Sequence, residues 1–101
     1  MLSYMADVFE ALSAPARRTI LDELRERDGQ TLYELCSRLT MKHGITLSRQ
    51  AISQHLDVLE SAGLISTRRD GKYKFHHINT EPLGAIVDRW LGPDVKSESN
   101  G

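Results

Sequence analysis

The sequence lacks several features that define whole classes of protein. It contains one cysteine, Cys36, so no disulfide can form within the chain, which fits a reducing compartment. It has no apolar run near the ~20 residues that a membrane-spanning helix requires. Its first eleven residues carry neither the basic start nor the small-residue cleavage site of a secretory signal. We therefore expect a cytoplasmic protein with no membrane partner.

Catalytic and metal-binding patterns are also missing. Zinc needs three or four convergent ligands, and the four histidines and one cysteine show no such spacing. His76 and His77 are adjacent in a predicted strand, so their side chains point to opposite faces. His55 falls on the apolar side of a predicted helix, as a hydrogen-bonded structural histidine, and Cys36 is expected to be a small buried residue. With no nucleophile–base constellation and no glycine-rich phosphate loop, the sequence predicts no enzyme, no metal site and no cofactor.

The charges that are present are unevenly distributed. The chain has 13 Lys or Arg against 14 Asp or Glu and a formal net charge of −1, which argues against a non-specific binder of polyanions. Residues 49–76, however, hold five Lys or Arg against three carboxylates. A local basic patch on a weakly charged chain predicts one kind of binding site with moderate affinity per subunit, which favours a dimer.

Apolar residues at three- and four-residue steps predict two helices near the start of the chain. The first carries a seam made of Leu2, Met5, Phe9 and Leu12. Pro15 cannot continue that helix but suits the first turn of the next one. We expect this second helix over residues 15–27, with its inward face formed by Ile20, Leu21 and Leu24.

Two capping signals predict the next pair of helices. Thr31 and Glu34 form a capping box at the start of a third helix, whose buried face is expected to consist of Leu32, Leu35 and Leu39. A loop over residues 40–47 separates it from a fourth helix. Ser48 is expected to cap that helix, which runs to about Ala62.

The last third of the chain predicts a hairpin and one more helix. Residues 64–69 and 72–78 form the expected strands, joined by Asp70-Gly71, a pair that favours a tight turn. Thr80 is expected to cap a final helix with an apolar stripe of Leu83, Ile86, Val87, Trp90 and Leu91. Residues 1–93 are thus expected to form one mainly α domain with a β-hairpin wing, a dimeric winged helix-turn-helix. We expect residues 94–101 to be a disordered tail.

The predicted fourth helix has two chemically different sides. One side is apolar, and the other carries within an arc of about 140° the residues Arg49, Gln50, Ser53, Gln54 and Asp57. Arginine suits guanine, glutamine suits adenine and serine suits either, so we expect bases to be read by Arg49, Gln50, Ser53 and Gln54. Ser48 and the free N–H groups beside it would hold a phosphate. The alternative is an ordinary solvated face, but the stripe lacks the Glu–Lys pairs usual there.

The predicted hairpin tip is basic. In the expected register Arg69 faces Lys72 and Thr67 faces Lys74, so Arg69, Lys72 and Lys74 share one surface, and Arg68 pairs with Tyr73 on the other. Like charges facing one another are destabilising unless a polyanion neutralises them. We expect phosphate contacts from Arg69, Lys72 and Lys74, and a minor-groove contact from Arg68. The alternative is protection of a strand edge, which explains one or two cations better than the whole cluster.

Two segments resemble the ArsR (arsenic-repressor-like) family of bacterial transcriptional regulators. They are FEALSAPARRTILDEL at residues 9–24 and SRQAISQHLDVLESAGLI at residues 48–65, the second followed by the basic wing. The resemblance covers about residues 5–91. It implies a homodimeric transcriptional repressor. We expect this repressor to bind double-stranded operator DNA and to act on its own gene among others. The first and last helices would form the dimer interface through Leu2, Met5, Phe9, Leu83, Ile86, Val87 and Trp90. Two apolar terminal helices on so small a chain favour the same arrangement.

The sequence departs from the family in two ways. Metal sensors of the family often carry Cys-x-Cys on the third helix, where residues 34–39 hold a single thiol, and residues 81–91 contain no histidine or cysteine. The metal-sensing function is therefore not carried over, and the sequence does not identify the inducer. The loop over residues 40–47 is longer than the usual turn, and it would bring Lys42 or His43 near a backbone phosphate.

Two alternatives to a homodimeric operator-binding regulator stay open. One is a winged-helix module that binds proteins and never contacts DNA. The other is a metal-responsive repressor whose ligands come from both subunits. The favoured function predicts a palindromic operator with half-sites about one helical turn, ~34 Å, apart.

Overall fold

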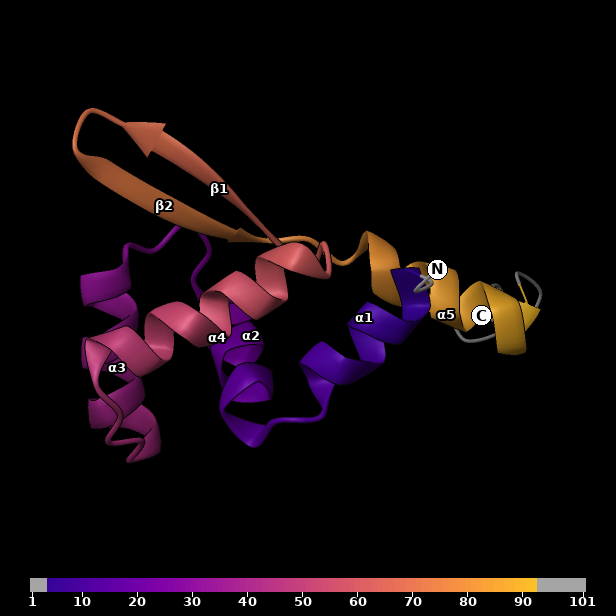
Figure 1. Cartoon of the computed structure of the whole chain (residues 1–101), viewed down its shortest axis with the longest axis horizontal. Coiled ribbons are helices and arrows are strands. Elements are labelled where there is room, and N and C mark those ends of the chain that lie inside the picture. Colours follow the sequence, from indigo (N-terminus) through magenta and orange to yellow (C-terminus); the bar gives the residue numbers. More distant parts are fainter. Residues whose placement is uncertain (1–3, 93–101) are drawn as a thin grey trace.

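The computed structural model describes residues 4–92, with side chains from Asp7 onward, so Leu2, the side chain of Met5 and the tail of residues 94–101 lie outside the described part. The elements follow the predicted order of four helices, a hairpin and a helix (Figure 1). They are α1 (Tyr4–Leu12), α2 (Pro15–Glu26), α3 (Leu32–His43), α4 (Arg49–Ser61), β1 (Ile65–Asp70), β2 (Tyr73–Ile78) and α5 (Glu81–Trp90). The predicted fold class, mainly helical with a β-hairpin wing, is confirmed.

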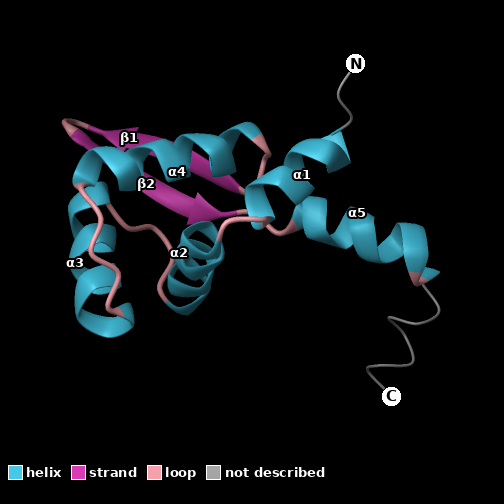
Figure 2. Cartoon of the chain, turned by 60° about the horizontal axis from the view of Figure 1, so that its bottom comes forward, coloured by secondary structure: helices cyan, strands magenta, loops and turns pink. Residues whose placement is uncertain are grey.

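The helices pack into one core, with the wing standing to one side. α2, α3 and α4 contact one another, and α1 and α5 lie side by side at the far end from α3 (Figure 2). The buried residues include the predicted inward side chains Ile20, Leu21, Leu24, Leu35 and Leu39. Leu32 is only partly buried against this core.

Side-chain caps set two of the helix starts. At α3 the Thr31 hydroxyl accepts a hydrogen bond from the Glu34 N–H at 3.2 Å, and the Glu34 carboxylate accepts one from the Thr31 N–H at 2.9 Å. At α4 the Ser48 hydroxyl accepts from the Ala51 N–H at 3.0 Å. The predicted capping box and serine cap are therefore confirmed.

The predicted cap at Thr80 is wrong. Thr80 has φ −94° and ψ 1°, outside the extended conformation of a capping residue, and its side chain makes no cap hydrogen bond. Instead, the Asn79 side-chain oxygen accepts from the Glu81 N–H at 3.3 Å. The start of α5 is thus satisfied one residue earlier than predicted.

The predicted loop over residues 40–47 is also wrong, because α3 continues to His43. Gly44 ends the helix with φ +66°, and its N–H bonds to the Thr40 carbonyl at 3.2 Å. The added turn is held to α2 by side chains, since Lys42 pairs with Glu26 and His43 lies 3.3 Å from Glu23. The connection to α4 is therefore only residues 44–48.

The register of the wing differs from the prediction. Asp70 pairs with Tyr73 and Arg69 pairs with Lys74, so the turn is Gly71-Lys72 rather than Asp70-Gly71. A type I′ turn at Asp70-Gly71 would need positive φ at both residues, and Gly71 alone has it, at +64°. Glycine as the first turn residue suits the type II′ alternative.

The base of the wing is fastened to the segment between α2 and α3. Gln30 and His76 form an isolated antiparallel bridge, with N–H to carbonyl distances of 3.2 and 2.8 Å. The Asp28 carboxylate accepts from the Ile78 N–H at 2.7 Å and lies 3.1 Å from the His77 ring nitrogen. The wing is thus anchored on β2, and its tip extends beyond the helices (Figure 1).

Candidate nucleic-acid interface

The polar stripe of α4 is exposed at the surface, as its position on the helix predicts. Gln50, Gln54 and Asp57 are exposed, and Arg49 is exposed at the first residue of the helix. Ser53 is half-buried. The opposite side of α4 enters the core through Ile52, Leu56 and Leu59. The amide and guanidinium groups that suit base edges therefore point away from the protein.

One edge of this stripe forms a groove with the wing and the start of α3. The groove has a volume of about 470 Å³, and its wall on α4 includes Arg49, Ser53 and Asp57. Lys72 and Lys74 line the wall on the wing. The other predicted site residues lie outside the groove, on α4 and its cap and on the wing: Ser48, Gln50, Gln54, Arg68 and Arg69.

Two exposed tyrosines, which the sequence did not predict as site residues, border the groove. Tyr33, at the start of α3, is 71% exposed, and Tyr73, at the start of β2, is 54% exposed. The Lys72 ammonium lies 5.8 Å from the centre of the Tyr73 ring. Aromatic side chains are more often buried than this. The sequence alone gives no signal that these two tyrosines are exposed, because their exposure depends on the tertiary contacts around them.

The cations near α4 and the wing are not used for packing. Within residues 7–92, no ion pair involves Arg49, Arg68, Arg69, Lys72 or Lys74. On α3, by contrast, Arg38 and Lys42 pair with Glu23 and Glu26, and His43 lies beside Glu23. Lys42 and His43 are therefore engaged within the protein rather than presented to a phosphate, whereas the cations of α4 and the wing are available to an anion.

The cations of the wing lie on two faces and at its tip. Arg69 and Lys74 are cross-strand partners and share one face, as predicted for these two. Arg68 pairs with Phe75 rather than Tyr73, on the opposite face. Lys72 belongs to the turn. The like charges of Arg69 and Lys74 face one another at close range, which an anion between the wing and a partner would relieve.

His55 and His76 make polar contacts within the protein, and Cys36 is half-buried. His55 Nδ1 lies 3.2 Å from the Arg17 guanidinium, and burial, followed by the charge of Arg17, lowers the pKa of His55. His76 is buried, with Nδ1 2.9 Å from the Gln30 carbonyl. Burial raises the pKa of the Cys36 thiol. In the part of the chain that the structure describes, no three His, Cys, Asp or Glu side chains converge as metal ligands.

An apolar surface lies at the end of the molecule formed by α1 and α5. The rings of Phe9 and Trp90 lie 6.0 Å apart, with Phe9 47% and Trp90 59% exposed. Leu91 beside them is 55% exposed. Leu83 and Ile86 pack partly against the core, and Val87 is half-buried. We call Phe9, Trp90 and Leu91 the terminal apolar surface.

No helix among residues 4–92 is long and apolar enough to cross a membrane.

Comparison with known proteins agrees with this geometry. Residues 12–68 match a family model described as a helix-turn-helix domain. A Bacillus subtilis HTH-type transcriptional regulator, YuzN, is 49% identical, with 83% of this chain and 91% of that protein covered. The transcriptional repressor SdpR of the same organism is 35% identical, covering 86% and 88%.

The fold also resembles those of transcriptional regulators whose structures have been solved. An ArsR-like transcriptional regulator from Rhodococcus sp. RHA1 is 29% identical with a TM-score of 0.70, covering 96% of this chain and 87% of that one. The residues that match the helix-turn-helix family model, 12–68, include α2, α3 and α4 as well as most of β1. The chain is therefore a DNA-binding transcriptional regulator of the helix-turn-helix class, and it belongs to the ArsR family.

Proposed function

We propose that this protein is a homodimeric repressor that binds a palindromic operator, including one at its own gene. The observation that carries the proposal is that the cations of α4 and the wing make no ion pair within residues 7–92. Three of them, Arg49, Lys72 and Lys74, line the groove beside an exposed polar stripe. SdpR, a relative of similar length, is named as a transcriptional repressor.

The proposal gives each site residue a role. Base edges in the major groove are read by Arg49, Gln50, Ser53 and Gln54. The DNA backbone is held by Ser48, Arg69, Lys72 and Lys74, and Arg68 reaches the minor groove. The second subunit is recruited through the terminal apolar surface together with Leu83, Ile86 and Val87. Two-fold symmetry then places two copies of α4 in successive major grooves, ~34 Å apart.

A footprint on the promoter of the protein's own gene tests the operator directly. We expect two protected half-sites related by symmetry, and protection that weakens steeply as salt rises, because phosphate contacts release counterions. Protection of no segment in preference to random duplex would contradict the proposal.

Charge reversal tests the wing. Arg69→Glu is expected to abolish retention of the operator while the circular dichroism spectrum and the dimer remain unchanged, because Arg69 is exposed and makes no ion pair within residues 7–92. Arg25→Glu, on the exposed side of α2, makes the same change of charge away from the groove and is the matched control. Equal binding by both variants would indicate a protein-binding module instead of a DNA-binding wing.

A further inference from the structure

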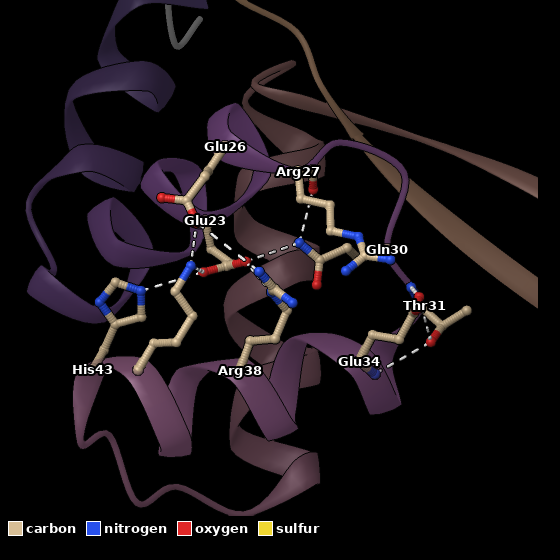
Figure 3. Close-up of polar contacts among 9 residues, drawn as sticks. Glu23, Glu26, Arg27, Gln30, Thr31, Glu34, Arg38 and His43 are labelled. Atoms are coloured by element: carbon tan, nitrogen blue, oxygen red, sulfur yellow. Dashed lines mark hydrogen bonds and ion pairs between the residues drawn. The ribbon is translucent and has the colours of Figure 1, made fainter.

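Glu23 on α2 is a buried carboxylate surrounded by hydrogen-bond donors (Figure 3). The residue is 1% exposed. Arg38 Nε donates to one carboxylate oxygen, and Gln30 Nε2 donates to the same oxygen at 3.2 Å. Lys42 Nζ and His43 Nε2 each lie 3.3 Å from the other oxygen. Four side chains from outside α2 therefore converge on this single group.

The donors connect Glu23 to both elements of the DNA interface. Arg38, Lys42 and His43 belong to the last two turns of α3, immediately before residues 44–48, which lead into α4. Gln30 pairs through its backbone with His76 of β2 at the base of the wing. One carboxylate thus holds the end of α3 on one side and the segment that anchors the wing on the other.

We propose that Glu23 is a positioning residue for DNA recognition, which fixes the placement of α4 relative to the wing through α3 and Gln30. This inference rests on the proposed reading of DNA by α4 and the wing. Sequence-specific contacts need both elements in one geometry, whereas non-specific binding depends mainly on the number of cations. Loss of the Glu23 contacts should therefore affect the operator and random duplex differently.

The sign of the effect separates positioning from simple electrostatics. Glu23→Gln removes one negative charge, so electrostatics alone predicts tighter binding to any DNA. Positioning predicts weaker binding to the operator, because the α3 cations lose their buried partner and the last turns of α3 are released. Glu26 contacts the same Lys42 and Arg38 but has a side chain that is 63% exposed, which makes Glu26→Gln a control of equal charge.

The experiment compares the full-length wild type, E23Q and E26Q on two duplexes, well below their melting temperatures. One duplex is selected by the wild-type protein from a random library, and the other is a scrambled duplex of the same length. We expect E23Q to bind the selected duplex roughly tenfold more weakly and the scrambled duplex no more weakly than wild type. E26Q should shift both affinities together and slightly. Parallel behaviour of E23Q and E26Q would overturn the inference.

Two further variants, R38Q and E23Q/R38Q, test the same contact. If E23Q does not fold, R38Q alone is compared with wild type and is expected to lose more affinity for the selected duplex than for the scrambled one, and equal losses would overturn the inference. In E23Q/R38Q the net charge equals that of the wild type, and no Arg38 guanidinium is left without the Glu23 carboxylate that it contacts in the wild type. We expect this double variant to prefer the selected duplex more than R38Q and E23Q predict additively, because the pair is coupled. Additive losses would overturn the inference. If the wild type itself selects no duplex, the proposed function fails instead, so the two failures are distinguishable.

Discussion

Gln54 is the side chain of α4 whose proposed role is the most specific. It is exposed and lies outside the groove, and an amide can donate to and accept from one adenine edge at once. Gln54→Ala should reduce discrimination at one base pair of each half-site by about 1–3 kcal/mol. Competition assays with operators substituted one position at a time measure this. A loss spread evenly over all sequences would assign Gln54 to the backbone.

Glu23 makes the stability of the fold depend on pH. Burial alone raises the pKa of this carboxyl, but hydrogen bonds from Arg38, Gln30, His43 and Lys42 outweigh burial and lower it from 4.5 to about 2. Because the folded pKa lies below the unfolded one, the stabilisation is complete above about pH 4.5. It is lost as the pH falls toward 2.

The same pair of variants tests this dependence. Chemical denaturation at neutral pH should show wild type more stable than Glu23→Gln, by an amount on the order of 3 kcal/mol. The difference should shrink steadily as the pH falls from 4.5 to 2. Glu26→Gln, with its exposed carboxylate, should follow the wild-type profile. A difference independent of pH would mean that packing, rather than charge, is responsible.

Individual residues were predictable from sequence where the cause is local. The Thr31–Glu34 capping box and the Ser48 cap depend on residues three positions apart, which the sequence displays directly. The predicted Thr80 cap was wrong because the preceding Asn79 is held by hydrogen bonds to the Gly63 and Leu64 carbonyls, distant contacts that the sequence does not display. The burial of Glu23 was equally invisible, since its donors lie up to twenty positions along the chain.

The wing depends on its turn, which places Gly71 at positive φ. An alanine side chain at Gly71 would meet nothing within 4 Å, so its only cost is the left-handed backbone, about 1–2 kcal/mol. Gly71→Ala should weaken operator binding by loosening the tip while leaving the melting of the helices nearly unchanged. Gly71→Asn should do less harm, because asparagine tolerates positive φ. Amide hydrogen exchange in β1 and β2 measures the loosening; equal protection in all three proteins would contradict it.

At the level of elements, the order was predictable and the boundaries only partly so. Hydrophobic periodicity marked each helix, and glycines marked the ends of α2 and α4. The last turn of α3 was missed because residues 40–43, among which only Met41 is apolar, show no apolar period. This turn is held instead by contacts of Lys42 and His43 with α2. The wing register was displaced because Asp-Gly favours one turn locally, whereas the pairing of Asp70 with Tyr73 selects another.

The terminal apolar surface should determine the quaternary state. Trp90→Ala is expected to shift the protein toward monomer in sedimentation experiments and to weaken operator binding. The reason is that the large Trp90 ring, which lies against Phe9 and is exposed in a single chain, would no longer be available for burial against the second subunit. Met41→Ala is the control, since Met41 is 83% exposed on α3 at the other end of the molecule. A monomeric wild type, or a dimer unaffected by loss of Trp90, would contradict the proposed interface.

The anchoring of β2 by Gln30 and Asp28 has a consequence for how the wing can evolve. Beyond the His76 bridge, only the paired residues from Arg68 to the turn and back to Phe75 are left to extend outward. Each pair adds ~3.3 Å of reach, and each also reverses the face on which the next side chains stand. Deleting one pair would therefore move the cations near the tip to the opposite face of the wing. Deleting two pairs would return them to their original face on a shorter wing. Wing length in homologous proteins with the same anchor should change in steps of two pairs.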